Sequence, residues 1–264
     1  MPKAKILICI GTMGRPTFKR CYESVLRAKA AFSQKTDLHI IKNKSPQSEW
    51  LNAMRKAALG WDWCFQIDED MYLYENAFED LYRFAIEKSK KTKVLSASSL
   101  LYDLFLERKI GSFKIWNSES LKKLRFNNVL GSDRDIAKRG TLIGLNTVAT
   151  NLVLGDHDSA PNTEIAYNKY YKYVEKLKKF GNQKDIEYII NFLQSKSNKD
   201  NISKSALRGA LDAKKALAFN PDSSIKENYI FDKKFYKSNK KIFLKDKISV
   251  IVTCFIRLYF IPYP

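Results

Sequence analysis

Two acidic residues separated by one position, Asp68 and Asp70, follow a short and largely apolar run from Trp63 to Ile67. Such a run is typical of a buried strand, and residues two apart on an extended chain lie on the same face. Open α/β folds bind their ligands beyond the carboxyl ends of their strands. The two carboxylates could therefore hold one hard divalent cation, directly or through water. The alternative is an acidic turn before a helix, with Asp70 or Asn76 as the helix cap.

Strands and helices alternate along the segment that must position these carboxylates. This alternation predicts an α/β fold with a parallel sheet and crossover helices. The loop Gly11–Arg15 leaves the carboxyl end of the first strand, and Asp68–Asp70 leaves that of the third, so both should line one crevice. We expect strands at 5–10, 37–41, 63–67, 94–98 and 111–116, and helices at 18–32, 50–59 and 76–86.

Several segments of this first part fit one known arrangement, namely Ile6–Thr12 with Arg15-Pro16, Cys21–Val25, the strand ending near Asn43, Asn52-Ala53, and Phe65–Met71 followed by Asn76-Ala77. In this order they resemble a glycosyltransferase of the GT-A fold, near the family 2 type, over roughly residues 5–160. The resemblance implies an α/β, GT-A (Rossmann-like) fold with a mixed, mostly parallel sheet flanked by helices.

The same resemblance implies an enzyme, a glycosyltransferase of the hexosyltransferase type. Such an enzyme moves a sugar from a nucleoside diphosphate-sugar donor to a hydroxyl of a glycan or lipid-linked acceptor. We expect the transfer to depend on a divalent metal ion and to invert the anomeric centre.

The catalytic base of the family is an aspartate before a helix, often within a Glu-Asp pair. Here Ser132 stands in place of the first acid, so the matching residue is either Asp133 or Asp135, and we favour Asp133. This carboxylate would accept the proton of the acceptor hydroxyl. The alternative for Asp133 is a capping role, which aspartate often fills at a helix N-terminus.

A late histidine completes the metal shell in many GT-A enzymes, and His157 resembles it. This residue lies in an acidic loop after the apolar stretch that begins near Asn146. A set of Asp68, Asp70 and His157 would suit Mn²⁺ or Mg²⁺, because a structural Zn²⁺ site would recruit thiolates. The alternative is that His157 is a surface residue beside aspartates.

Four residues are candidates for binding the donor nucleoside and its phosphates: Thr12, Arg15, Asn43 and Asp68. Many family members carry an aspartate where this chain has Lys42-Asn43. Recognition of the base therefore stays open at this point.

The C-terminal part differs in character from the catalytic domain predicted at 1–160. We expect a basic helical extension at 161–246, with helices at 164–180, 185–193 and 203–219. These helices could cap the acceptor side, lie against an anionic membrane, or form an ordinary helical subdomain. The apolar tail 247–264 resembles the opening strand of a second family 2 module, or it is an interfacial anchor behind Lys240–Lys247. It is too short for a membrane span and contains Arg257.

The net charge of the chain is +19, and the excess is concentrated in the C-terminal part. Residues 1–160 carry 26 basic and 18 acidic side chains, whereas residues 161–264 carry 21 and 10. Such an excess suits an anionic partner, for example membrane lipid, nucleic acid or an acidic glycan. The alternative is a lysine-rich composition that only keeps the surface solvated.

The N-terminus shows no signal peptide, and the four cysteines are scattered without metal-type spacing. Cys9 and Cys64 lie inside apolar runs, which fits small buried residues in a reducing compartment. We expect a cytoplasmic protein, free or peripheral on the inner face of the membrane.

Two rival functions follow from the same features. A nucleotidyltransferase has a similar sheet and metal, but it should carry a Gly-rich, Arg-bearing loop that cradles a triphosphate, and Gly11–Arg15 matches this only faintly. A non-enzymatic, basic protein that binds glycan or nucleic acid would explain the charge. Such a protein would have no role for the carboxylates at the sheet edge. We therefore do not expect nucleic acid as a partner.

Overall fold

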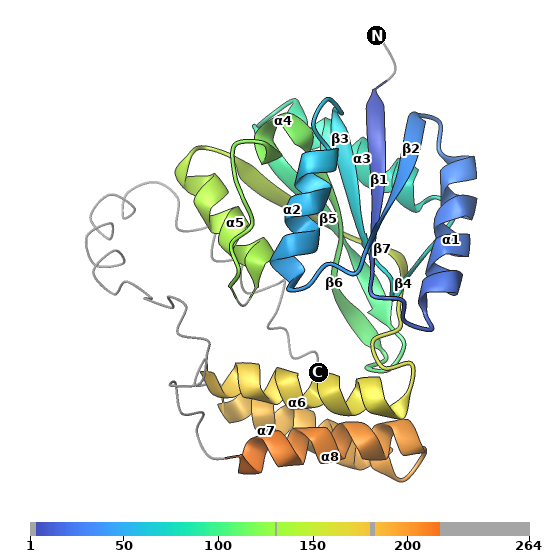
Figure 1. The fold of residues 1–264 in the computed structure, drawn as a ribbon, viewed down its shortest axis with the longest axis vertical. Helices are drawn as coiled ribbons and strands as arrows, with labels where there is room; N and C mark the ends of the chain where they lie inside the picture. The colour runs from blue at the N-terminus through green and yellow to red at the C-terminus, as the bar shows by residue number, and fades with distance from the viewer. Residues whose placement is uncertain (1–3, 130, 180–182, 217–264) are drawn as a thin grey trace. The chain divides into compact units, whose positions relative to one another are not determined.

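The computed structural model describes residues 4–129, 131–179 and 183–216 of the chain (Figure 1). Within these residues the chain divides into two compact units, one ending at His157 and the other beginning at Asp158. The division lies close to the boundary predicted at residue 160. The predicted apolar tail, 247–264, and the basic segment Lys240–Lys247 lie outside the described residues.

The described part of the first unit is built on one sheet of seven strands, in the order β2–β1–β3–β6–β5–β7–β4. β2, β1 and β3 are parallel to one another, and β5 is parallel to β7. The pairs β3–β6, β6–β5 and β7–β4 are antiparallel. The strands are β1 (Lys5–Thr12), β2 (Lys35–Lys42), β3 (Trp63–Asp68), β4 (Met71–Leu73), β5 (Val94–Asp103), β6 (Arg108–Asn117) and β7 (Asn146–His157).

The predicted α/β fold, a mixed sheet flanked by helices, is confirmed. Parallel pairings are not the majority, however, because three of the six pairings described are antiparallel. β5 and β6 are joined by the short connection Leu104–Glu107, which permits only an antiparallel hairpin. β4 has three residues and, within the described residues, pairs with the last residues of β7 alone.

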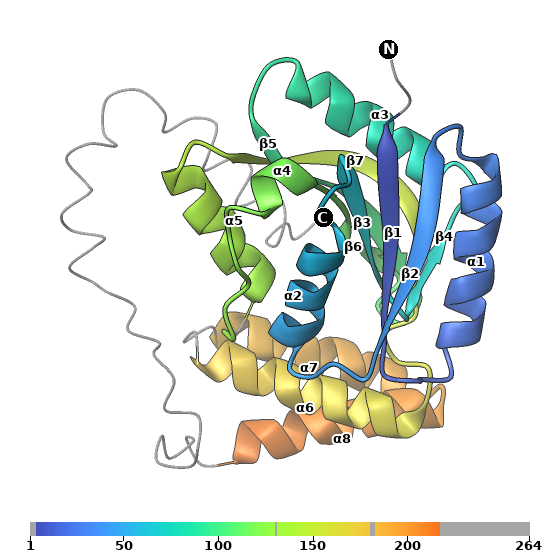
Figure 2. The ribbon, with the colours of Figure 1, turned by 45° about the horizontal axis from the view of Figure 1, so that its top comes forward.

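Helices cover both faces of the sheet, since the central strands carry apolar side chains on both sides (Figure 2). Along β1, Ile6, Ile8 and Ile10 pack in the same core cluster as α1 and α3. Leu7 and Cys9 pack with α2 on the other face. A continuous apolar run is typical of a strand buried in this way. The helices of this unit are α1 (Phe18–Ala31), α2 (Gln47–Ala57), α3 (Ala77–Ser89), α4 (Ser118–Leu121) and α5 (Ser132–Leu142).

Three cysteines of the first unit are buried as free thiols: Cys9, Cys21 and Cys64. Cys9 and Cys64 belong to the apolar core, as predicted. Burial raises the pKa of the Cys64 thiol well above its ordinary value, so this group stays protonated. The fourth cysteine, Cys254, lies outside the described residues.

The second unit contains the helices α6 (Thr163–Lys179), α7 (Gln183–Ser197) and α8 (Asn201–Lys215). The three helices predicted here are confirmed with shifted ends. α8 approaches α6 closely, because a Cβ atom placed on Gly209 would lie 2.3 Å from the carbonyl oxygen of Tyr167. Among the helices described, none is both long and apolar enough to cross a membrane.

Candidate functional site

A cavity of about 430 Å³ opens beyond the carboxyl ends of β1 and β3. Residues of four segments line it. They are the end of β1 with the loop that follows (Gly11–Arg15), the end of β2 with the segment that follows (Ile41–Trp50), the end of β3 with its turn (Asp68–Asp70), and His157 at the end of β7. The expectation that the first and third of these segments share one crevice is confirmed. Parallel pairing of β1 with β3 causes this, because Gly11 lies opposite Asp68.

The wall of the cavity includes the buried indole of Trp50, which lies against Gly11. A Cβ atom placed on Gly11 would come within 2.8 Å of that ring. Glycine therefore allows α2 to bring Trp50 up to the end of β1. This close approach shapes the side of the cavity next to β2.

Asp68 and Asp70 do not lie on one extended strand, so that expectation is wrong. β3 ends at Asp68, and Glu69 and Asp70 form a turn that leads into β4. The turn still directs both carboxylates into the cavity. The capping alternative does not apply to Asp70, because Asn76 occupies the N-cap position of α3.

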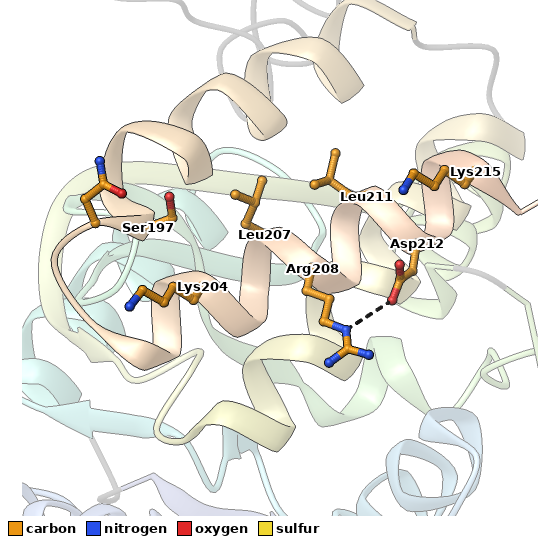
Figure 3. A pocket seen from close by; sticks show the side chains of 8 residues that line it. Ser197, Lys204, Leu207, Arg208, Leu211, Asp212 and Lys215 are labelled. Carbon is orange, nitrogen blue, oxygen red and sulfur yellow. Dashed lines mark ion pairs between the residues drawn. The ribbon is translucent and has the colours of Figure 1, made fainter.

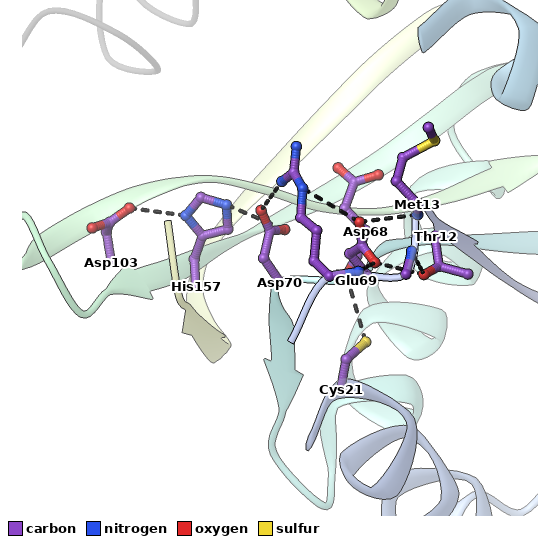
Figure 4. A network of polar contacts seen from close by, with 10 residues as sticks. Thr12, Met13, Cys21, Asp68, Glu69, Asp70, Asp103 and His157 are labelled. Carbon is purple, nitrogen blue, oxygen red and sulfur yellow. Dashed lines mark hydrogen bonds and ion pairs between the residues drawn. The ribbon is translucent and has the colours of Figure 1, made fainter. Parts of the chain in front are cut away.

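His157 lies between two carboxylates (Figure 4). Its Nδ1 is 2.8 Å from Oδ2 of Asp103, and its Nε2 is 3.5 Å from Oδ1 of Asp70. His157 is the last residue of β7 rather than part of a loop, and it is opposite Met71 of β4. Asp103, the last residue of β5, is fully buried, and sequence reasoning missed it because the predicted strand stopped at Ser98.

The positions of Asp70 and His157 fit two ligands of one divalent cation. Two atoms bound at right angles to an octahedral cation at about 2.1 Å lie about 3 Å apart, close to the 3.5 Å found here. An imidazole whose second nitrogen donates to a carboxylate is the usual arrangement of a metal-bound histidine. The described residues hold no group of three or more His, Cys, Asp or Glu side chains already arranged around one ion.

The pKa of Asp68 is shifted by burial and by the charged groups around it. Burial and the neighbouring Asp70 raise the pKa of Asp68 to about 7, and Lys114 and His157 oppose this rise. Asp70 raises the pKa of Asp68 because two neighbouring carboxylates repel each other when both are ionised. A cation bound beside them would relieve that repulsion.

Glu69, between the two aspartates, is buried and bonded to the loop after β1. Its carboxylate accepts hydrogen bonds from the Thr12 hydroxyl and from the backbone N–H groups of Met13 and Arg15. The Arg15 side chain is about half exposed, and its Nη1 is 3.6 Å from Oδ2 of Asp70. No role was predicted for Glu69, since its partners lie more than 50 positions away in the sequence.

The donor-binding candidates are not equivalent in the structure. Arg15 and Asp68 line the cavity, and so does Thr12, although its hydroxyl is engaged by Glu69. Asn43 does not line it: this exposed residue has a φ of 55°, and its backbone N–H donates to the carbonyl of Thr12. Its neighbour Lys44 lines the cavity instead.

Asp133 forms an ion pair with Lys114 of β6, with 2.6 Å between Oδ2 and Nζ. Lys114 is the main cause that lowers the pKa of Asp133 to about 2, so this carboxylate is ionised at neutral pH. Asp133 and Lys114 are not among the residues that line the cavity, although the charges of both act on the pKa of Asp68. Asp133 does not occupy the N-cap position of α5, because Gly131 does, so the capping alternative for Asp133 is wrong.

Asp135 has different neighbours. Its Oδ2 lies 2.7 Å from Nη2 of Arg139 and accepts a hydrogen bond from Asn127. These partners are on α5 itself and on the segment before it. Asp133 is therefore the better candidate for a catalytic base.

The second unit has a cavity of its own, of about 320 Å³, along α8 (Figure 3). Its walls include the basic residues Lys204, Arg208 and Lys215 and the partly buried Leu207 and Leu211. Arg208 pairs with Asp212 one turn further along the helix, with 3.8 Å between Nε and Oδ2. The wall is therefore basic with an apolar floor.

No protein-family model matches the chain, and no curated protein matches it in sequence. Solved structures do match. Residues 1–349 of TarS from S. aureus are 12% identical, with 85% of this chain and 76% of that chain covered and a TM-score of 0.44. A mannosyltransferase from Pyrobaculum calidifontis, in complex with GDP-Man and Mn²⁺, is 10% identical, with 80% and 74% covered and a TM-score of 0.47.

A CMP:2-keto-3-deoxy-manno-octonic acid synthetase complexed with CTP also matches. It is 9% identical, with 58% of this chain and 91% of that chain covered and a TM-score of 0.39. At such values the likeness concerns the fold alone.

Proposed function

We propose that the chain is a glycosyltransferase of the hexosyltransferase type, which transfers a sugar from a nucleoside diphosphate-sugar to an acceptor hydroxyl of a glycan or lipid-linked molecule. The observation that carries the proposal is the constellation of Asp68, Asp70 and His157 in one cavity, with Asp103 behind the histidine. A cavity that combines acidic ligands with a cationic side chain suits a metal-bound diphosphate. Arg15 supplies the cation here.

The metal of the proposed enzyme is Mn²⁺ or Mg²⁺. Asp70 and His157 would bind it directly, and Asp68 would do so directly or through water. When bound, such an ion neutralises negative charge on a departing diphosphate. The remaining ligands would be phosphate oxygens of the donor and water.

Arg15 would contribute a second positive charge to the diphosphate. The Arg15 side chain is about half exposed beside Asp70, so it can contact a ligand in the cavity without leaving a buried position. Preorganised positive charge of this kind stabilises a leaving group whose charge develops in the transition state. Thr12 and Asn43 would act through the shape of their loops. The Thr12 hydroxyl bonds to Glu69, and the backbone N–H of Asn43 bonds to the carbonyl oxygen of Thr12.

Asp133 is the proposed general base of an inverting transfer. Its carboxylate is ionised and held by Lys114, so it can accept a proton from a hydroxyl placed beside it. A base with a pKa of about 2 is weak, because Lys114 stabilises its charged form. A bound diphosphate that attracts Lys114 would loosen this ion pair and make Asp133 more basic.

The helical unit is the proposed contact for an anionic partner. The cationic side chains of the α8 cavity and its apolar floor suit a lipid-linked acceptor or an anionic membrane surface. We propose a cytoplasmic enzyme that is peripheral on the inner face of the membrane. Free, buried thiols are consistent with a reducing compartment.

The test is a thermal-shift and transfer screen of nucleoside diphosphate-sugars with and without Mn²⁺. Asp70→Asn should abolish the Mn²⁺-dependent shift and the transfer. Asp156→Asn is a matched control, since this carboxylate lies one residue from His157 and bonds to the Tyr74 hydroxyl. Transfer at the wild-type rate by Asp70→Asn would contradict the proposal.

A second variant separates the two candidate bases. Asp133→Asn should abolish transfer while the affinity for a nucleoside diphosphate with Mn²⁺ stays close to that of the wild type. Asp135→Asn should retain transfer, because its carboxylate is paired with Arg139. The opposite result would assign the base to Asp135.

A further inference from the structure

Glu69 is a buried carboxylate for which the proposed chemistry has no direct use. It is 4% exposed, although it lies between two aspartates that face the cavity. Burying a charged carboxylate is unfavourable unless hydrogen bonds or opposite charges compensate for the lost water. The partners of Glu69 therefore indicate what this residue does.

Those partners all belong to Thr12–Arg15, that is, to the last residue of β1 and the loop that follows it (Figure 4). Oε1 accepts the N–H of Met13 at 3.0 Å, and Oε2 accepts the N–H of Arg15 at 2.9 Å. Oε2 also accepts the Thr12 hydroxyl at 2.5 Å. The guanidinium Nε of Arg15 lies 3.5 Å from Oε1.

The loop is shaped to surround an anion. Gly14 has a φ of +80°, and this left-handed conformation turns the N–H groups of its two neighbours, Met13 and Arg15, towards the same side. Backbone N–H groups that converge on one side of a loop in this way form an anion-binding concavity of the kind that holds phosphates. In this chain the anion is the carboxylate of Glu69.

We infer that Glu69 is a positioning residue that closes the loop Thr12–Arg15 onto the turn bearing Asp68 and Asp70. The N–H groups of Met13 and Arg15 bond to Glu69, and that of Gly14 bonds to the hydroxyl oxygen of Thr12. The donor diphosphate therefore meets the side chain of Arg15 rather than the loop backbone. This inference rests on the proposed function for the identity of the ligand. The contact between Glu69 and the loop does not depend on it.

The contacts of Glu69 also argue against the nucleotidyltransferase alternative. Enzymes that cradle a triphosphate in a glycine-containing loop need its backbone N–H groups for the phosphates. Here Met13 and Arg15 give theirs to Glu69. The loop after β1 therefore does not serve as a triphosphate cradle while Glu69 holds it.

Glu69→Gln is the informative substitution, because it keeps the shape of the side chain. A glutamine has one acceptor oxygen, so it must direct its NH₂ group at one of the two loop N–H groups. Glu69→Asp keeps both oxygens and the charge on a shorter side chain. Glu79→Gln is a matched control, since this partly buried glutamate accepts a hydrogen bond from the Ser33 hydroxyl and has no contact with the loop among the bonds described.

The first measurement is amide hydrogen exchange of the full-length protein without ligand. In Glu69→Gln, the Met13 and Arg15 amides should exchange at least about tenfold faster than in the wild type, since each loses a charge-assisted bond. The amides of β1 in Glu69→Gln should exchange at wild-type rates. The Met13 and Arg15 amides of Glu79→Gln should also exchange at wild-type rates. Unchanged exchange at Met13 and Arg15 would overturn the inference.

The second measurement is the affinity for UDP, GDP and CDP, each with Mn²⁺. Glu69→Gln should weaken binding of the preferred nucleotide about tenfold, and Glu69→Asp should restore part of it. Faster loop exchange with unchanged nucleotide affinity would overturn the positioning role. If the wild type binds none of the three, the proposed function fails, whereas the exchange measurement still decides whether Glu69 holds the loop.

Discussion

His157 and Asp103 are joined by a short contact, with 2.8 Å between the imidazole Nδ1 and the carboxylate Oδ2. The parallel pairing of β5 with β7 places the two residues opposite each other. The other oxygen of Asp103 accepts the backbone N–H groups of Phe105 and Leu106, so the carboxylate is held on both sides. An ionised carboxylate can only accept, so Nδ1 of His157 donates to Asp103, and Nε2 is the nitrogen that faces Asp70. Once His157 is neutral, Nε2 therefore offers its lone pair to a metal ion.

We predict that Asp103→Asn weakens the binding of Mn²⁺ without unfolding the protein. The asparagine oxygen can keep the bonds to the loop N–H groups, so its NH₂ group then faces Nδ1 of His157. That nitrogen must become the acceptor, which moves the proton to Nε2 and blocks it as a ligand. The affinity for Mn²⁺ in the presence of a nucleoside diphosphate should fall about 10- to 100-fold, measured by calorimetry.

The tautomer itself can be observed by ¹⁵N NMR of the imidazole. Wild type should show the proton on Nδ1 and Asp103→Asn should show it on Nε2. Asp156→Asn serves as the control, with the wild-type tautomer and wild-type Mn²⁺ affinity expected. If Asp103→Asn binds Mn²⁺ as tightly as this control does, His157 is not a ligand.

The ion pair between Lys114 and Asp133 should make stability depend on pH. The pKa of Asp133 is lowered from 3.8 to about 2, so its contribution is complete above pH 3.8 and disappears as the pH falls through about 2. The pH-dependent part of the difference in unfolding free energy between wild type and Asp133→Asn is about 2 kcal/mol at pH 6. Urea denaturation at several pH values between 6 and 2 measures it.

Asp135→Asn is the control for this experiment. Its partner Arg139 is four residues away on the same helix, and both side chains are partly exposed. Such a pair contributes about 0.5 kcal/mol, so the variant should differ little from the wild type at pH 6. A difference between wild type and Asp133→Asn that does not change between pH 6 and pH 2 would contradict the ion pair.

Most elements of the fold could be predicted because their signals are local. β1 contains an uninterrupted apolar run, which indicates a strand. The spacing of apolar residues indicates the helix α3, and the glycines near the end of β1 indicate a loop. None of these signals depends on other segments of the chain. β4 has only three residues, and its existence depends on pairing with the end of β7 more than 80 positions later. No local pattern encodes such a pairing.

The residues of the candidate site could likewise be predicted only where their signals are local. Asp68, Asp70, His157 and Asp133 could be proposed because of their types and their order along the chain, whereas Asp103 and Glu69 were missed. Both missed residues are buried acids whose partners come from distant segments. A buried acid has no sequence signal of its own, and only the folded chain supplies the groups that neutralise it.

Gly11→Ala should disturb the cavity more than Gly14→Ala does. A Cβ atom at Gly11 lies 2.8 Å from the Trp50 indole, whereas Gly14 has open space but a positive φ. Overpacking should cost Gly11→Ala about 1–3 kcal/mol and displace Trp50 from the cavity wall. Gly14→Ala should cost about 1 kcal/mol through its backbone. Urea denaturation gives both values, and equal losses of stability would contradict the packing argument.

The basic wall of the α8 cavity should mediate contact with an anionic surface. Lys204 and Arg208 are exposed on adjacent turns of α8, next to the partly buried Leu207. Each basic residue near an anionic membrane contributes about 1 kcal/mol, so the double variant Lys204→Glu with Arg208→Glu should weaken binding at least about tenfold. Flotation with vesicles of phosphatidylglycerol and phosphatidylcholine measures the bound fraction.

Two controls distinguish this surface from a general effect of net charge. Lys184→Glu with Lys172→Glu makes the same change in charge on exposed positions of α7 and α6 that do not line the cavity. If the α8 wall binds the membrane, this second variant should float nearly as well as the wild type, and binding by both should weaken with salt. Equal losses in the two double variants would mean that net charge alone attracts the protein. Unchanged flotation of Lys204→Glu with Arg208→Glu would exclude the α8 wall, because reversing both charges there must oppose an anionic surface.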